Sequence, residues 1–342
     1  MAKLRSFIEI DNGVRGNYTY FRSMKSSLRD KKIAVLGGNG FFGSHIVDLL
    51  KAQKLQVYIS STKEGVDFRK FKDCRYYFKK TSPDIVINCA AIQGGIGYHE
   101  GKQADLLGDN VMMGFNLMLA AFQENVKKFV NIVAGCTYPG YLEKQVMHEE
   151  DFWDGEVHDS IFSYGVARKA SVAYGKALHK QYGFNSIHLI LANMYGPRDH
   201  YDPIQSKALA ALIKKIYEAK KNNLPSVEIW GTGKPLRDWL FVKDGAEGVL
   251  RATEVYNRIE PLNISTGIGV SVTKLAKLIK DVVGYKGRFE YNTNRPDGAL
   301  KKVFGTKKMK KELSWQPSTS IEKGIEEAVK WFDRNHDKIR NS

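Results

Sequence analysis

The stretch Ile33-Ala34-Val35-Leu36-Gly37-Gly38-Asn39-Gly40-Phe41-Phe42-Gly43 decides the fold that we expect. Its four apolar residues predict a short strand that is buried on both faces. Three glycines follow with the spacing G-x-x-G-x-x-G, and an amphipathic helix is expected over residues 44–55. The first glycine permits a tight turn, the second lets a pyrophosphate approach the backbone, and the third lets helix and strand pack closely. Because the start of a helix attracts phosphate, the stretch predicts a dinucleotide site.

The rest of the chain alternates between strand-like and helical patterns. Strands are expected at 56–60, 83–89, 128–133, 186–191, 227–230 and 261–265, and helices at 110–123, 163–182, 206–221, 244–255, 272–283 and 321–335. This alternation predicts an α/β fold, a Rossmann doubly wound parallel sheet. We expect an N-terminal extension over residues 1–30, with a short helix near Tyr20–Leu28. The Rossmann domain would follow over 31–192, and a smaller, discontinuous α/β substrate lobe over 193–342, with segments near 238–266 returning to the Rossmann domain.

Composition narrows the class of protein. The 342 residues are 43% hydrophobic and 26% charged, which is ordinary for a globular protein. We expect neither a membrane segment nor a secretion signal, since no apolar run is long enough. The three cysteines are widely spaced, which fits a reducing cytoplasm and predicts no metal site. The net charge of +16 comes from lysines spread over many segments, so we expect a solvated basic surface rather than a nucleic-acid partner. A few of these cations can instead face an anionic small molecule.

The end of the second strand indicates which cofactor binds. An acidic residue there would bind the ribose hydroxyls of NAD. This chain has Ser60, Ser61 and Lys63 at that point, and these suit a 2′-phosphate better. We therefore predict NADP(H) in preference to NAD(H). Asp67, further along, is placed to reach the adenine amino group.

A tyrosine and a cation open the predicted helix 163–182. Tyr164 and Arg168 are four residues apart and therefore lie on one helix face. A nearby cation lowers the pKa of a phenol, which can then exchange a proton with a carbinol or ketone while hydride moves to or from nicotinamide. The alternative is that Tyr164 is a packing residue at a helix start.

Several further segments carry a resemblance to a known family. They are Ala90–Ile96, Asn110 with Met112-Met113, Cys136–Pro139, Glu149–Trp153, Tyr164–Ala167, Asn193–Pro197, Trp230–Gly233, Arg237-Asp238 and Arg295–Gly298. With the glycine turn, they make the chain similar to the extended short-chain dehydrogenase/reductases. The similarity is greatest to the GDP-L-fucose synthase branch of the nucleotide-sugar epimerase/reductases. It runs from about Lys32 to Phe332.

The resemblance implies an enzyme that epimerises a 4-keto hexose or heptose carried on GDP and reduces it with NADPH. It also implies a homodimer and a role in surface-polysaccharide sugar biosynthesis. Tyr164 matches the catalytic tyrosine and Cys136 the epimerisation base. Trp230 and Arg237 match residues that hold the nucleotide diphosphate, and Lys215 matches a substrate-contacting arginine. The matching segments also imply cofactor contacts at Gly37, Gly40, Phe41, Phe42, Gly43, Ala90, Ala91, Asn110, Tyr164, Arg168, Ala192 and Met194. They imply substrate contacts at Gly94, Gly95, Asn193, Lys207 and Lys302.

Three positions depart from the pattern of that family. Arg168 replaces the lysine that follows the tyrosine, and Ala134 replaces a serine or threonine that would bind the substrate carbonyl, leaving Thr137 as the nearest hydroxyl. Lys207 aligns with the histidine that acts as epimerisation acid. These changes leave three hypotheses: a reductase or epimerase/reductase, an epimerase or oxidoreductase that retains its cofactor, and a nucleotide-sugar-binding homologue with impaired catalysis. A 4,6-dehydratase is not expected, because no Asp-Glu pair follows Thr137.

Overall fold

The computed structural model describes residues 27–340, except 61–64, 100, 143, 145, 203–204, 296 and 298. A parallel six-stranded sheet forms its centre, in the order β2-β1-β3-β4-β5-β9. The strands are β1 (Lys32–Leu36), β2 (Gln56–Ser60), β3 (Ile85–Asn88), β4 (Lys128–Ala134), β5 (Ser186–Leu191) and β9 (Leu262–Ile264). The strand order reverses between β1 and β3, which is where ligands bind in open α/β sheets. The N-terminal extension lies almost wholly outside the described residues.

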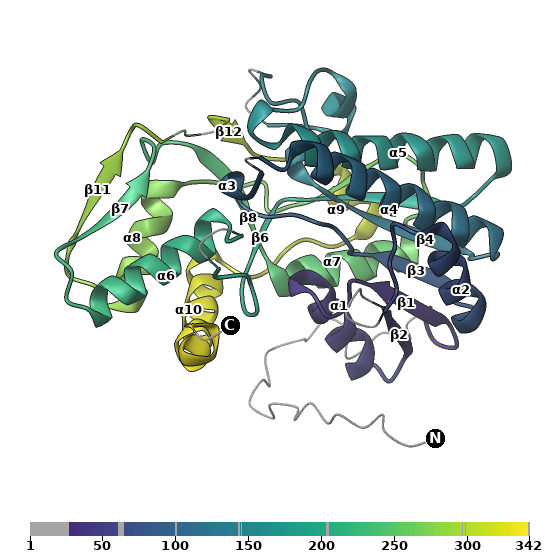
Figure 1. Ribbon diagram of the computed structural model, residues 1–342, viewed down its shortest axis with the longest axis horizontal. Helices are drawn as coiled ribbons and strands as arrows, with labels where there is room; N and C mark the ends of the chain where they lie inside the picture. The colour runs from purple at the N-terminus through teal and green to yellow at the C-terminus, as the bar shows by residue number, and fades with distance from the viewer. Residues whose placement is uncertain are drawn as a thin grey trace.

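Helices cover both faces of this sheet (Figure 1). Ile33 and Val35 of β1 join a core that includes residues of α1 (Phe41–Ala52) and α7 (Val242–Val255). Ala34 and Leu36, which point the other way, join a second core. That core includes residues of α2 (Phe71–Thr81), α4 (Gln103–Gln123) and α5 (Phe162–Tyr182). The predicted doubly wound fold is therefore confirmed. Within the described part of the chain, no helix is long and apolar enough to span a bilayer.

A second lobe has its own core. It is built on α6 (Ala208–Lys221), α8 (Val272–Val283), α10 (Ile321–Arg340), and the parallel pair β7 (Ser226–Trp230) and β11 (Arg288–Asn292). A small sheet lies between the two lobes, in which β8 (Leu236–Phe241) pairs with β6 (Asn193–Tyr195), β10 (Gly269–Ser271) and β12 (Lys301–Lys302) (Figure 1). This lobe places its cations near the carboxyl ends of the large sheet's strands.

Several elements differ from the sequence-based expectation. The helix expected at 110–123 begins at Gln103, and the one expected at 44–55 begins at Phe41, directly after the glycine turn. The elements α2, α3 (Ile96–His99), β6, β8, β10, β11, β12 and α9 (Lys307–Leu313) were not predicted. The helix α9 packs on α7 and β9, so a segment beyond 238–266 also lies against the Rossmann layer.

Candidate active site

The glycine turn joins β1 to α1 and holds their ends close together. Gly37 has φ +72°, which favours glycine, and its amide donates to the Ser60 carbonyl at the end of β2 (2.8 Å). A side chain on Gly43 would lie against the Gly37 carbonyl and 2.9 Å from the Gly38 Cα. Gly40 precedes α1 and no side chain caps the helix, so its first amides remain available to an anion. This turn fits the pyrophosphate of a dinucleotide.

The residues predicted to select the cofactor lie beside this turn. Ser60 is fully buried, and its hydroxyl has no hydrogen-bond partner among the described residues. Ser61 and Lys63 lie outside the described residues. Asp67 accepts hydrogen bonds from the Arg69 backbone (3.1 Å) and guanidinium (2.9 Å), and this contact holds the pKa of the Asp67 carboxyl below its usual range. On the other side of α1, Phe42 and Met194 lie together near Gly245.

The loop after β3 is held by Asn110 of α4. Its Oδ1 accepts from the Ile92 amide (3.1 Å), and its Nδ2 donates to the carbonyls of Ile92 (2.9 Å) and Leu106 (2.8 Å). Both amide hydrogens are thus engaged with protein, so Asn110 shapes the cofactor loop instead of offering a free donor to the cofactor. Ala90 in this loop lies close to Gly37, while Ala91 is exposed.

Tyr164 and Arg168 lie in the first turns of α5 and are both buried, with 3% of each residue exposed. The guanidinium carbon is 5.9 Å from the Tyr164 ring centroid. Arg168 donates to the carbonyls of Ala90 (3.4 Å) and Ile132, which joins α5 to the loop that touches Gly37. The predicted tyrosine site therefore lies next to the predicted cofactor turn.

The pKa of Tyr164 differs from the expectation. Burial raises it to about 12, and the opposing effect of Arg168 is smaller. The prediction of a lowered pKa was wrong, because desolvation of a buried phenolate outweighs one nearby cation. Tyr164 is therefore a neutral phenol at physiological pH, which is the form that can donate a proton.

Cys136 lies in the 3-10 helix η2 (Gly135–Thr137), directly after β4. Burial raises the pKa of its thiol, while Lys302, Lys207 and Arg168 lower it by smaller amounts. The thiol is consequently protonated at neutral pH, whereas a base needs the thiolate. Thr137 is fully buried and its hydroxyl donates to the Ala134 carbonyl (2.7 Å), so its hydrogen is engaged with the turn.

Two lysines from the second lobe, Lys302 and Lys207, lie close to Cys136. Lys302 and Arg237 are opposite each other on β12 and β8, and Lys302 is only 7% exposed. Burial lowers the pKa of Lys302 to about 8, and burial also lowers that of Arg237. Lys207 precedes α6; burial raises the pKa of both Cys136 and Asp199, and Lys207 lies close enough to oppose that rise. Such a concentration of buried positive charge fits a diphosphate.

An exposed tryptophan marks the outer end of this cationic surface. Trp230 is 48% exposed, with Lys215 Nζ 5.1 Å and Arg295 Cζ 4.8 Å from the centroid of its ring. Its indole N–H donates to Glu228 (2.7 Å). The sequence pattern included Arg295 only as part of a motif; the structure adds it to the site because it stacks on the indole. Asn193, at the start of β6, is exposed.

Two predicted substrate glycines have packing roles. A side chain on Gly94 would collide with the ring of Tyr98, and one on Gly95 would collide with the Ser206 carbonyl. The Gly95 amide also donates to the Gln205 carbonyl (3.0 Å). These glycines bring the loop after β3 against the segment that leads to Lys207, which closes the site from a second side. Among the described residues, no cluster of His, Cys, Asp and Glu could hold a metal ion.

Known proteins that are similar to this chain also bind a nicotinamide dinucleotide or are named for nucleotide-sugar chemistry. The model of the NAD dependent epimerase/dehydratase family matches residues 33–265. The chain belongs to this family. Among its relatives, GDP-L-fucose synthase 1 of Arabidopsis thaliana is 32% identical over 312 residues, covering 91% of this chain and 96% of that protein. The resemblance predicted from the sequence is thereby confirmed.

Solved structures extend the comparison. A GDP-6-OMe-4-keto-L-xylo-heptose reductase from C. jejuni has a TM-score of 0.83 and 26% identity, over 89% of this chain and 98% of that one. A GDP-L-fucose synthetase from Naegleria fowleri bound to NADP has a TM-score of 0.81 and 26% identity, over 91% and 97%. The chain is thus an oxidoreductase/epimerase of the nucleotide-sugar class, and the expectation of a nicotinamide dinucleotide cofactor is confirmed.

Proposed function

We propose that this protein is an NADPH-dependent reductase of a GDP-linked 4-keto hexose or heptose, with Tyr164 as the proton donor. The observation that carries the proposal is the contact chain from Gly37 through Ala90 to Arg168, because it sets the tyrosine beside the cofactor turn. Relatives named as GDP-sugar synthases and reductases support the substrate class.

The protonation state of Tyr164 favours reduction. The glycine turn would hold NADPH, which when bound would supply hydride to the carbonyl carbon, so that the carbonyl oxygen would need a proton. Tyr164 enters as a neutral phenol, since burial keeps its pKa at about 12. Its Oη–H donates to that oxygen as the C–O double bond becomes a single bond. The phenolate that remains is stabilised by the Arg168 guanidinium, which is held in place by two backbone carbonyls.

The cofactor preference rests on the end of β2. We propose NADP(H), because the run Ser60-Ser61-Thr62-Lys63 directly at the end of β2 contains no carboxylate to bind ribose hydroxyls. The hydroxyl of Ser61 and the amine of Lys63 would bind the 2′-phosphate. Asp67 is available to the adenine, with its carboxylate fixed by Arg69.

The second lobe supports a nucleoside diphosphate substrate. Lys302 and Lys207 supply positive charge beside Cys136, and Arg237 lies opposite Lys302. Trp230 offers an exposed aromatic face to the base. Guanine follows from the names of the relatives, and the 4-keto group follows from the name of the GDP-6-OMe-4-keto-L-xylo-heptose reductase.

Epimerisation is the second candidate function, favoured by one observation. Cys136 lies among three cations that lower the pKa of its thiol against the effect of burial. A bound diphosphate would offset those cations, whereas loss of water from the site would strengthen each of them. Cys136 would remove a proton from the carbon next to the ketone, with Lys207 as the acid on the opposite face.

We also propose that the protein is a cytoplasmic homodimer that supplies sugars for surface polysaccharides. The helices α4 and α5 pack against each other and expose large apolar side chains, among them Met112, Phe162 and Tyr182. A two-fold pairing of these helices would cover those side chains. The three cysteines are free, which fits a reducing compartment.

The test is consumption of NADPH on addition of GDP-4-keto-6-deoxymannose and of GDP-4-keto-heptoses. NADPH absorbance should fall with at least one of these sugars, and it should fall faster than NADH absorbance does under the same conditions. Absence of consumption across the panel would contradict it. Solvent deuterium appearing in the sugar without redox change would favour the epimerase, and loss of that exchange in Cys136→Ser would assign the base.

A further inference from the structure

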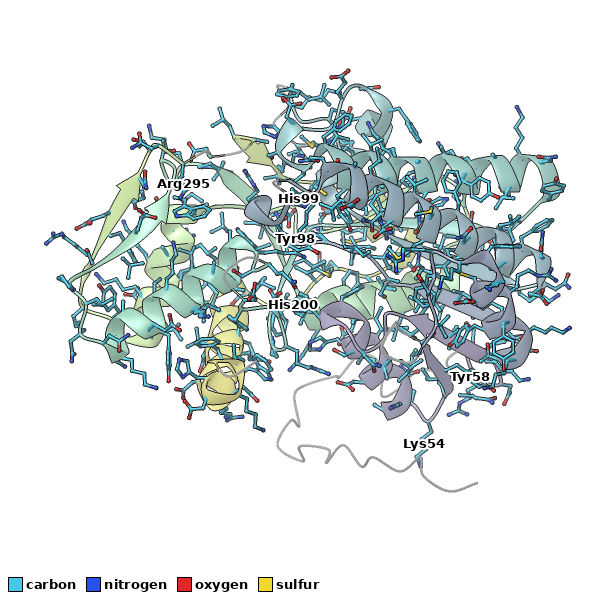
Figure 2. The ribbon with its side chains drawn as sticks, in the orientation of Figure 1. Lys54, Tyr58, Tyr98, His99, His200 and Arg295 are labelled. Carbon is cyan, nitrogen blue, oxygen red and sulfur yellow. The ribbon has the colours of Figure 1, made fainter. Side chains whose placement is uncertain are left out.

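A buried histidine lies beside the proposed proton donor and takes no part in the chemistry described above. His99 ends α3, which follows the Gly94-Gly95 loop, and only 2% of the residue is exposed. Its ring meets the Tyr164 ring edge to face, with the centroids 6.4 Å apart and the planes at 81°. Figure 2 shows His99 near the middle of the molecule, where the two lobes meet.

One nitrogen of this imidazole is engaged and the other is not. The ring forms a hydrogen bond with the Gly94 backbone, and Nδ1 has no partner among the described residues. The engaged nitrogen is therefore Nε2. Because this bond favours the protonated form of the ring, Nε2 acts as the donor and the Gly94 carbonyl as the acceptor. Burial lowers the pKa of His99, so the ring is neutral and Nδ1 carries a lone pair.

A buried acceptor without a partner is costly to a fold and is rare. The imidazole that carries this acceptor packs edge to face against the ring of Tyr164, at the end of the helix that follows the Gly94-Gly95 loop. A ligand bound next to Tyr164 can supply the missing donor. A nucleotide sugar carries hydroxyl groups next to the ring carbon whose carbonyl oxygen Tyr164 would protonate, and each of these hydroxyls is a donor.

We propose that His99 is a specificity-determining residue whose Nδ1 accepts a hydrogen bond from a hydroxyl of the bound sugar. This inference rests on the proposed function, since it takes the ligand to be a GDP-sugar. The imidazole would then fix the orientation of the sugar against Tyr164. It would also favour sugars that carry a hydroxyl at that ring position over deoxy analogues, because a deoxy sugar leaves the buried lone pair unsatisfied.

Two substitutions distinguish sugar binding through Nδ1 from a purely structural role, in which His99 only holds the Gly94 loop through Nε2. In His99→Asn, the side-chain oxygen takes roughly the place of Nδ1, and the bond to Gly94 is lost. In His99→Gln, the side-chain amide takes roughly the place of Nε2, and the acceptor near Tyr164 is lost. Each variant, loaded with NADPH, is titrated with GDP-mannose and with GDP in a calorimeter.

We expect His99→Gln to bind GDP-mannose about tenfold more weakly than the wild type does, and to bind GDP as tightly as the wild type does. His99→Asn should retain most of the affinity for GDP-mannose. Wild-type affinity for GDP-mannose in His99→Gln, an equal loss for GDP, or a larger loss in His99→Asn would each overturn it. If the wild type binds neither GDP nor GDP-mannose, the proposed function fails and this inference falls with it.

A measurement on the unaltered protein covers the case in which a variant does not fold. In protein labelled with 15N at histidine, the His99 Nδ1 resonance should move upfield on addition of GDP-mannose, because an unprotonated ring nitrogen that accepts a hydrogen bond is shielded. Addition of GDP alone should leave it in place. An unmoved resonance with both ligands bound would overturn the proposal.

Discussion

Substituting Gly43→Ala tests whether the close packing of the glycine turn holds the cofactor site together. The new Cβ would lie against the Gly37 carbonyl and 2.9 Å from the Gly38 Cα, where carbon atoms ordinarily stay about 3.5–4.0 Å apart. Both neighbours are backbone, so relief requires α1 to move away from the end of β1. Overpacking of this kind costs about 1–3 kcal/mol. We expect the free energy of unfolding to fall and the affinity for NADPH to fall at least about tenfold.

Gly108→Ala is the matched control. Gly108 also lies within a helix, α4, and a Cβ there would meet nothing within 4 Å. Alanine in a helix interior is favoured over glycine by about 0.5–1 kcal/mol, so this variant should be slightly more stable than the wild type. Urea denaturation measures stability, and NADPH fluorescence measures binding. A Gly43→Ala variant that matches Gly108→Ala in both measurements would refute the reasoning.

Three further predictions concern other sites. Burial lowers the pKa of His45 from 6.5 to about 3 in the folded protein. As the pH falls below 6.5, the unfolded chain therefore binds a proton at this histidine before the folded chain does. The free energy of unfolding falls between pH 6.5 and pH 3, by up to about 1.4 kcal/mol per pH unit. His45→Gln should reduce the loss seen by urea denaturation between pH 7 and pH 5, and an unchanged loss would contradict the assignment. Lys128 donates to the carbonyls of Thr253 and Tyr256 at the end of α7 (both 2.6 Å). Lys128→Met leaves these carbonyls without that donor, so it should lower the free energy of unfolding by about 1–3 kcal/mol. A Lys128→Met variant as stable as the wild type would contradict this. Trp230→Ala should weaken GDP binding by about 1–3 kcal/mol while NADPH binding holds, and equal loss of both would contradict the placement of the base.

The Rossmann layer was predictable because its strands are buried on both faces and its helices are amphipathic, and both patterns can be read along the chain. The elements that were missed lack such patterns. The helix α2 is rich in charge and carries only a narrow apolar face. The strands β10 and β12 have three and two residues, and their pairing with β8 depends on contacts distant in sequence. The start of α4 at Gln103 gives no capping signal, since no side chain caps it.

The sequence predicted which residues form the site better than it predicted their protonation states and contacts. Tyr164, Arg168 and Cys136 are brought together as the motifs indicated. Their pKa values depend on burial, which spacing does not reveal, and burial reverses the direction expected for Tyr164. Two further features are tertiary contacts that no local sequence pattern predicts. They are the hydrogen bonds of Asn110 to the loop after β3 and the packing of His99 against Tyr164.

Transfer of deuterium from NADPH deuterated at the transferable C4 position tests the central claim most directly. The wild-type protein, incubated with this cofactor and a GDP-4-keto sugar that it consumes, should give a GDP-sugar heavier by about one mass unit at C4, because one hydride moves in each turnover. Tyr164→Phe, at a cofactor concentration that saturates it, should transfer almost no label, because the oxygen receives no proton. Product without label, or full transfer in Tyr164→Phe, would contradict the account.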